Sequence, residues 1–200
     1  MKIVAIVGSP RLKGNTSILV DAALEEAAAQ GCEVEKIMLS QYKIEGCRGH
    51  DLCRTFEKCK IEDDIPMIQD KCRTADGIIL ATFVYYFNMT AQMKTFVDRS
   101  FFLYTHGIRL KSKCMGLIVV AGSAGDDITV RALRRCFRIK GDNTPENWLE
   151  VRGYASGLGD VKNNPELIAK ARELGTRMVE KIGNLDVAKA EDVADPRRQG

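Results

Sequence analysis

Short runs of apolar residues recur along the chain, separated by longer segments in which apolar and polar positions follow a helical spacing. The first run, Ile3 to Val7, has no alternation of apolar and polar residues, which is typical of a strand buried on both faces of a parallel sheet. Similar runs follow further along the chain. The pattern predicts five strands, at residues 2–7, 33–38, 77–83, 115–121 and 149–154.

Helices are predicted between and after these strands. Residues 16–30 are rich in Ala, Leu and Glu and end at Gly31, a residue type that commonly terminates helices. After Pro165, which suits a first helical turn, apolar residues recur at three- and four-residue spacings as far as Ile182. Residues 183–200 are expected to form a polar C-terminal tail. The remaining helices are predicted from Asp63 or Asp64 to 73, over 89–104 and over 128–139.

Strands that alternate with helices predict an α/β domain, a doubly wound five-stranded parallel sheet with helices on both faces. The order expected for five such strands is 2-1-3-4-5. One domain over residues 1–182 accounts for the pattern, with 183–200 outside it. Ligands of such sheets bind beyond the carboxyl ends of the strands, beside strand 1. The loop after Val7 is therefore the first candidate site.

Composition narrows the classes of function. Thirty basic residues against twenty-seven acidic ones give a net charge of +3, too balanced for a protein that neutralises nucleic-acid phosphates. The first apolar run is too short for the core of a secretion signal, and no apolar run is long enough to span a bilayer. We therefore expect a cytoplasmic protein that binds neither nucleic acid nor membranes.

The loop between the first strand and the first helix combines residue types that bind an anion. Gly8 and Gly14 let the backbone turn sharply, hydroxyl groups and helix-start amides can donate hydrogen bonds, and Arg11 adds positive charge. The alternative is a plain turn in which Asn15 or Thr16 caps the helix. The loop lacks the Gly-Lys-Ser/Thr of nucleoside triphosphatases. The candidate phosphate ligands are Ser9, Arg11, Gly14, Asn15, Thr16 and Ser17.

Two segments resemble a known family. Gly-Ser-Pro-Arg-x-x-Gly-Asn-Thr-Ser at 8–17 is similar to the opening of the NADPH-dependent FMN reductase family, which is flavodoxin-like. Residues 75–99 resemble the third strand, flavin loop and following helix of that family, although the family usually has proline at the position of Phe83. The resemblance implies an FMN whose phosphate lies on the first segment and whose ring is wrapped by residues 82–88. The implied ring contacts are Thr82, Phe83, Val84, Tyr85, Tyr86 and Asn88.

Parts of the second segment also have an ordinary structural explanation. The aromatic run at 85–87 could pack as core instead of stacking on a flavin. Lys94, Asp98 and Arg99 match family positions, but their spacing lets them pair with one another along one helix. We expect these three charged residues to be structural.

A second loop of small residues, 121–125, follows the fourth predicted strand at the same edge of the sheet. It resembles the glycine-rich loop that passes beside the flavin in this family. The resemblance makes Gly122 and Ser123 candidate cofactor contacts. Small residues are also typical of a bare turn, and that alternative stays open.

Three of the seven cysteines lie close together after the second strand. Thiolates at such short spacings can bind one metal ion or cluster. The segment resembles the Cys-x2-Cys-x2-Cys-x5-Cys loop and acidic pair of the iron–sulfur flavoprotein branch, with His50 in place of the second cysteine. A [4Fe-4S] cluster, a zinc ion and an empty loop all remain possible. The candidate metal ligands are Cys47, His50, Cys53 and Cys59.

The other four cysteines lie in or beside predicted helices and strands. We expect them to be small buried hydrophobic residues: Cys32, Cys72, Cys114 and Cys136.

The resemblance implies an FMN-binding oxidoreductase that takes electrons from NAD(P)H and passes them to a flavin, a quinone or another acceptor. Because the flavin carries this chemistry, no protein side chain is assigned as catalytic. One alternative is an electron carrier in which a cluster at 47–59 exchanges electrons with ferredoxin; another is a flavin-binding module without turnover. The electron acceptor is expected to be a small molecule or a protein, and the resemblance also implies a homodimer or homotetramer.

Overall fold

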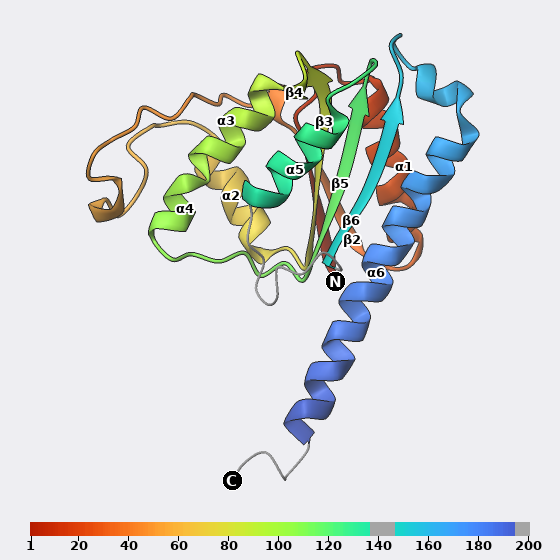
Figure 1. Ribbon diagram of the computed structural model, residues 1–200. Coiled ribbons are helices and arrows are strands. Elements are labelled where there is room, and N and C mark those ends of the chain that lie inside the picture. The colour runs from red at the N-terminus through yellow and green to blue at the C-terminus, as the bar shows by residue number, and fades with distance from the viewer. Residues whose placement is uncertain (137–146, 195–200) are drawn as a thin grey trace.

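The computed structural model describes residues 1–136 and 147–194, with the side chains of the last helix described as far as Leu185. Five parallel strands form its sheet in the spatial order β2-β1-β3-β5-β6 (Figure 1). This is the predicted order 2-1-3-4-5 with one extra strand counted along the chain, so the predicted fold is confirmed. The strands are β1 (Lys2–Val7), β2 (Glu33–Met38), β3 (Gly77–Tyr85), β5 (Cys114–Ala121) and β6 (Trp148–Tyr154).

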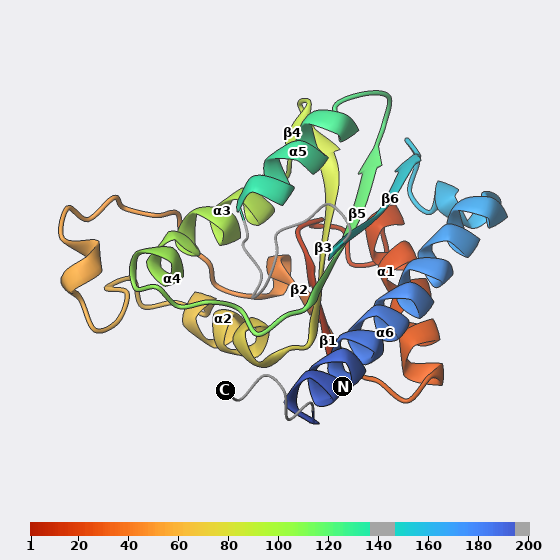
Figure 2. The same ribbon diagram turned by 60° about the horizontal axis from the view of Figure 1, so that its bottom comes forward.

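Helices cover both faces of the sheet, as predicted (Figures 1 and 2). One apolar core lies between the sheet and α1 and α6, and a second lies between the opposite face and α2, α3 and α5. Burial of two faces explains why the central strands β1, β3 and β5 are nearly continuous apolar runs, whereas the edge strands β2 and β6 also contain charged residues. The helices are α1 (Asn15–Ala29), α2 (Ile65–Thr74), α3 (Ala91–Arg99), α4 (Phe101–Thr105), α5 (Asp126–Cys136) and α6 (Pro165–Ala194).

The segment predicted as one helix over 89–104 is built differently. The chain first makes a two-residue strand, β4 (Asn88–Met89), which pairs antiparallel with the end of β3. Thr90 then caps α3 by accepting a hydrogen bond from the Met93 amide at 3.2 Å. The helical residues are divided at Ser100 into α3 and α4. The helical spacing of apolar residues was therefore correct, but it did not reveal the hairpin before α3.

The last helix was predicted to end at Ile182, but it continues to Ala194. Residues 184–194 contain neither glycine nor proline and are rich in Ala, Asp, Glu and Lys, so nothing in this stretch interrupts a helix. In Figure 1 the end of α6 extends beyond the sheet. Residues 195–200 of the predicted tail, and residues 137–139 of the predicted helix at 128–139, lie outside the described residues.

Three of the four cysteines predicted to be buried, Cys32, Cys72 and Cys114, are buried, but Cys136 is exposed. Its position in the last turn of α5 faces away from the core, and its thiol donates a hydrogen bond to the Ala132 carbonyl at 3.0 Å. Among the described helices, none combines the length and the apolar character needed to cross a bilayer.

Candidate functional site

The loop after β1 leads into a helix start that no side chain caps within the part of the chain that the structure describes. Gly14, the residue before α1, has extended backbone angles, and its position makes no side-chain cap hydrogen bond. The first turn of α1 contains no acidic residue. The alternative of a plain turn capped by Asn15 or Thr16 is therefore wrong. The first amides of α1 are left to bind an external acceptor, and the helix dipole favours an anion there.

Thr16 provides the most direct test of whether this loop fits a phosphate. Its side chain is 0 % exposed, and its hydroxyl has no hydrogen-bond partner within the described residues. A buried hydroxyl without a partner is costly, which makes it a marker for a ligand that supplies one. Ser9 is also buried, and Arg11 is exposed with no ion pair to any residue that the structure describes. Hydroxyl, amide and guanidinium donors in one loop match the needs of a phosphate group.

The side chains of Asn15 and Ser17 bond elsewhere. The Asn15 amide group donates to the Gly157 carbonyl at 2.7 Å and accepts from the Val161 amide at 3.3 Å. The Ser17 hydroxyl accepts a hydrogen bond from the Lys36 ammonium group at 3.1 Å. Both side chains thus hold the start of α1 in place, and the contact with phosphate predicted for Asn15 is left to its backbone amide.

The hairpin between β3 and β4 turns through two aromatic residues in the left-handed conformation. Tyr86 has φ 48° and Phe87 has φ 65°, while the flanking Tyr85 and Asn88 pair with each other. A two-residue turn of this kind usually contains glycine or asparagine. For a residue of another type, the left-handed conformation costs about 1–2 kcal/mol. Tyr86 is 96 % exposed and Phe87 is 59 % exposed, so the aromatic run is not core.

The side chains of the residues before the turn pack into the protein, so a flavin contact predicted for them would involve their backbone. Thr82 and Val84 are buried, and Phe83 packs partly against the core on the α1 side of the sheet. The Thr82 hydroxyl accepts from the Thr90 amide at 3.1 Å. The Thr90 hydroxyl in turn donates to the Gly8 carbonyl at 2.8 Å. Thr90 was missed by the sequence analysis, although a threonine before a helical run is a recognised capping pattern.

The glycine-rich loop after β5 packs directly against the hairpin. Gly125 has φ 94°, and a Cβ atom at this position would lie 2.7 Å from Cα of Phe87. Gly122 and Ser123 are exposed, and the Gly122 carbonyl accepts a hydrogen bond from Ser156 at 3.3 Å. The loop at residues 8–17, which we call the phosphate loop, therefore meets three other segments at the carboxyl edge of the sheet: the hairpin, the glycine-rich loop and the segment after β6. This is the edge where a ligand site is expected.

The cysteine segment forms a long loop that extends away from the sheet beside α4 (Figure 1). Cys47 is exposed and Cys53 and Cys59 are half-buried, and all three thiols are free. Within the described residues, no three His, Cys, Asp or Glu side chains are arranged to hold a single metal ion. All four predicted ligands nevertheless line one pocket. The pocket is formed by Cys47, Gly49, His50, Cys53, Cys59, Ile61, Asp98, Arg99, Phe101 and Phe102.

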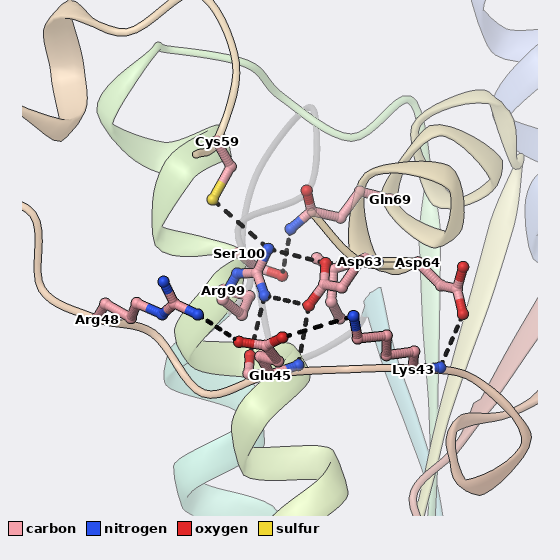
Figure 3. Close-up of polar contacts among 10 residues, drawn as sticks. Lys43, Glu45, Arg48, Cys59, Asp63, Asp64, Gln69, Arg99 and Ser100 are labelled. Carbon is pink, nitrogen blue, oxygen red and sulfur yellow. Dashed lines mark hydrogen bonds and ion pairs between the residues drawn. The ribbon is translucent and has the colours of Figure 1, made fainter. Parts of the chain in front are cut away.

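The base of this loop is closed by the acidic pair that follows it (Figure 3). Asp63 accepts a hydrogen bond from the Glu45 amide at 2.8 Å, and Asp64 accepts one from the Lys43 amide at 2.7 Å. Arg99 forms an ion pair with Asp63, and both side chains are almost fully buried. Burial alone would raise the pKa of Asp63, but the hydrogen bonds from Arg99 and from two backbone amides outweigh burial and lower it.

The expected pairing along α3 is only half correct. Lys94 pairs with Asp98 at 2.6 Å, as its spacing predicts. Arg99 does not join them but points to Asp63, which lies 36 residues earlier in the chain. Sequence spacing along one helix cannot reveal such a partner.

Comparison with known proteins agrees with this geometry. Residues 1–152 match the family model described as NADPH-dependent FMN reductase. The chain belongs to the NADPH-dependent FMN reductase family. Like other members it is a flavodoxin-like FMN-binding oxidoreductase.

Individual relatives of this family member are similar over most of their length. An iron–sulfur flavoprotein of Methanocaldococcus jannaschii is 36% identical over 189 residues, covering 91% of this chain and 97% of the relative. An iron–sulfur flavoprotein of Archaeoglobus fulgidus is 39% identical over 183 residues, covering 90% and 80%. Among solved structures, an NAD(P)H:quinone oxidoreductase from Methanothermobacter marburgensis has the same fold, with a TM-score of 0.68 and 16% identity over 88% of this chain and 95% of that one.

Proposed function

We propose that this FMN-binding protein contains an iron–sulfur cluster as a second redox centre and passes electrons between the cluster and FMN. The observation that carries the proposal is the single pocket lined by Cys47, His50, Cys53 and Cys59. Three thiolates and one imidazole are a competent ligand set for a cluster. Two of the curated relatives with high coverage are named iron–sulfur flavoproteins, which supports the same conclusion.

A cluster is favoured over a zinc ion by the arrangement of the four side chains. A zinc ion needs its ligands to converge on one point at about 2.0–2.3 Å. Here the four side chains surround a pocket, and within the described residues no group of three converges in that way. Separated ligands around a pocket are suited to a multi-atom cluster, whose irons each take a ligand from a different side.

For FMN, we propose that the phosphate binds the first amides of α1 together with the hydroxyl of Thr16 and the guanidinium group of Arg11. The ring would lie between the exposed hairpin residues Tyr85 and Tyr86 and the glycine-rich loop at 122–123. When bound, FMN supplies the chemistry of accepting and releasing electrons. The protein anchors the phosphate through fixed donors and positions the ring through a strained turn that Gly125 supports.

A second candidate is a nicotinamide-linked reductase that uses FMN alone, passing electrons from NAD(P)H to a flavin, a quinone or another acceptor. The family match over residues 1–152 favours it, because that family is described as NADPH-dependent. In the first candidate ferredoxin is the natural one-electron partner of a cluster. For both candidates we propose a homodimer or homotetramer.

The deciding experiment is an anaerobic absorption spectrum with FMN, iron and acid-labile sulfide measured on the same sample. The cluster proposal predicts flavin bands with a broad shoulder at about 400 nm and about four irons for each chain. Cys53→Ser should lower the iron content, whereas Cys136→Ser, an exposed thiol outside the pocket lining, should not. Flavin without iron would refute the cluster and leave the nicotinamide-linked reductase, which a stopped-flow reduction with NADPH then tests.

A further inference from the structure

Arg99 is a buried cation with several partners that no flavin contact accounts for. Its side chain is 1% exposed, and it lies at the last position of α3. One edge of the guanidinium group donates to both carboxylate oxygens of Asp63, at 2.5 and 3.0 Å. The same group donates to the Glu45 carbonyl at 2.9 Å and contacts Cys59 Sγ at 3.5 Å (Figure 3).

These partners lie at both ends of the cysteine loop. Glu45 comes just before the first predicted ligand, whereas Cys59 and Asp63 come at and just after the last one. A single planar group thus joins the two ends of the loop to α3. Lysine has one donor atom and cannot reproduce this arrangement, because only the guanidinium fork donates in several fixed directions at once.

The other end of α3 is fixed at the flavin edge. Thr90, which caps the helix, donates its hydroxyl proton to the Gly8 carbonyl next to the phosphate loop. The nine residues of α3 span about 14 Å at 1.5 Å for each residue. The helix therefore connects the edge of the sheet where FMN is proposed to bind with the pocket lined by the cysteines.

Charge close to a ligand sulfur has a defined effect on a cluster. The half-buried Cys59 sulfur contacts a buried guanidinium group, and electrostatic interactions are stronger in the interior of a protein than in water. A hydrogen bond from a cation favours the more negative, reduced form of a cluster and so raises its reduction potential. By contrast, the ion pair of Arg73 with Asp70 on α2 is exposed to solvent.

We infer that Arg99 is a positioning residue for the cluster ligand Cys59: it ties both ends of the cysteine loop to α3 and donates a hydrogen bond to the ligand sulfur. The inference rests on the cluster of the proposed function. It assigns Arg99 and Asp63 a role in redox tuning, beyond the four ligands themselves.

The test compares Arg99→Lys with Arg73→Lys in the full-length protein purified anaerobically. Arg99→Lys keeps the buried positive charge beside Asp63, so the fold is retained, and the FMN content serves as the check. Arg73→Lys makes the same change in an exposed arginine–aspartate pair. The readouts are iron for each chain, the midpoint potential of the cluster in an EPR-monitored titration, and hydrogen–deuterium exchange of residues 45–59.

Arg99→Lys should lower the midpoint potential and speed exchange of the loop amides tenfold or more, with the FMN content unchanged. Arg73→Lys should change neither the potential nor the exchange. The double variant Asp63→Asn with Arg99→Gln removes both buried charges together and should show the same two effects. Wild-type potential and exchange in both Arg99 variants would overturn the inference.

Failure of the proposed function would be visible in a different sample. Wild-type protein that takes up no iron after reconstitution refutes the cluster, and with it the redox role of Arg99, before any variant is made. Wild-type protein with iron and an unaffected Arg99→Lys variant refutes only the role of Arg99.

Discussion

Thr16→Val is the substitution that most directly tests the phosphate loop. The Thr16 hydroxyl is buried and without a partner within the described residues, and leaving such a group unsatisfied costs about 1–3 kcal/mol. Valine has nearly the same shape, and both residues are β-branched, so packing and rotamer freedom change little. The free energy of unfolding of the FMN-free protein should therefore rise, by about 1 kcal/mol.

The same substitution should weaken FMN binding. A hydrogen bond to a charged group contributes about 1.5–3 kcal/mol, which corresponds to a loss of roughly 10- to 100-fold in affinity. Affinity is measured by quenching of flavin fluorescence when FMN is titrated with the FMN-free protein, and stability by urea denaturation of the same preparation. The expected result is a higher free energy of unfolding together with a lower affinity for FMN. A general loss of structure would lower both.

Ser112→Ala is the matched control. The Ser112 hydroxyl is also fully buried, but it donates to the Cys114 carbonyl at 2.8 Å and lies at the amino end of β5, opposite the candidate site. Its removal should lower the free energy of unfolding by about 1 kcal/mol and leave FMN affinity unchanged. If Thr16→Val instead behaves like Ser112→Ala in both measurements, the assignment of the Thr16 hydroxyl to the phosphate is wrong.

Three further predictions follow from the backbone and from one carboxylate. Gly125→Ala should lower the melting temperature more than Gly31→Ala, because both glycines have positive φ but only the first would press a Cβ atom against Phe87. Tyr86→Gly should relieve about 1 kcal/mol of strain in the FMN-free protein and weaken FMN binding, and equal affinity would contradict stacking on Tyr86. For Asp76, burial opposes ionisation, but hydrogen bonds from a lysine side chain and a backbone amide outweigh it and lower the pKa. Asp76→Asn should therefore reduce stability at neutral pH, and the difference from wild type should shrink as the pH falls through the lowered pKa; a constant difference from pH 7 to 2 would contradict this.

Much of the fold could be read from local patterns. The strand runs and the first helix are set by apolar periodicity and by a terminal glycine, and the structure places β1 and β2 at the predicted residues. Errors occurred where tertiary contacts override a local pattern. The hairpin before α3 depends on a turn of two aromatic residues that ordinary turn preferences disfavour, so the helical spacing around it suggested one continuous helix.

The phosphate loop shows the same division at the level of single residues. The residue types at 8–17 predict an anion site, because glycines, hydroxyl groups and a helix start have this capacity wherever they occur together. The sequence could not distinguish Thr16, whose hydroxyl has no partner within the described residues, from Asn15, whose side chain is bonded to Gly157. That distinction depends on a loop that is 142 residues away in the chain.

Sequence alone determined the order of the elements, the doubly wound sheet and the chemical character of the phosphate loop and the cysteine loop, because each depends on neighbouring residues. Only the tertiary structure decided which distant groups meet: Gly125 with Phe87 at the carboxyl edge of the sheet, and Arg99 with Asp63 and Cys59 at the base of the cysteine loop. The physical reason is that these contacts join segments that are far apart in the sequence and are brought together only when the helices pack on the sheet. A contact between distant segments leaves no periodic pattern in the sequence.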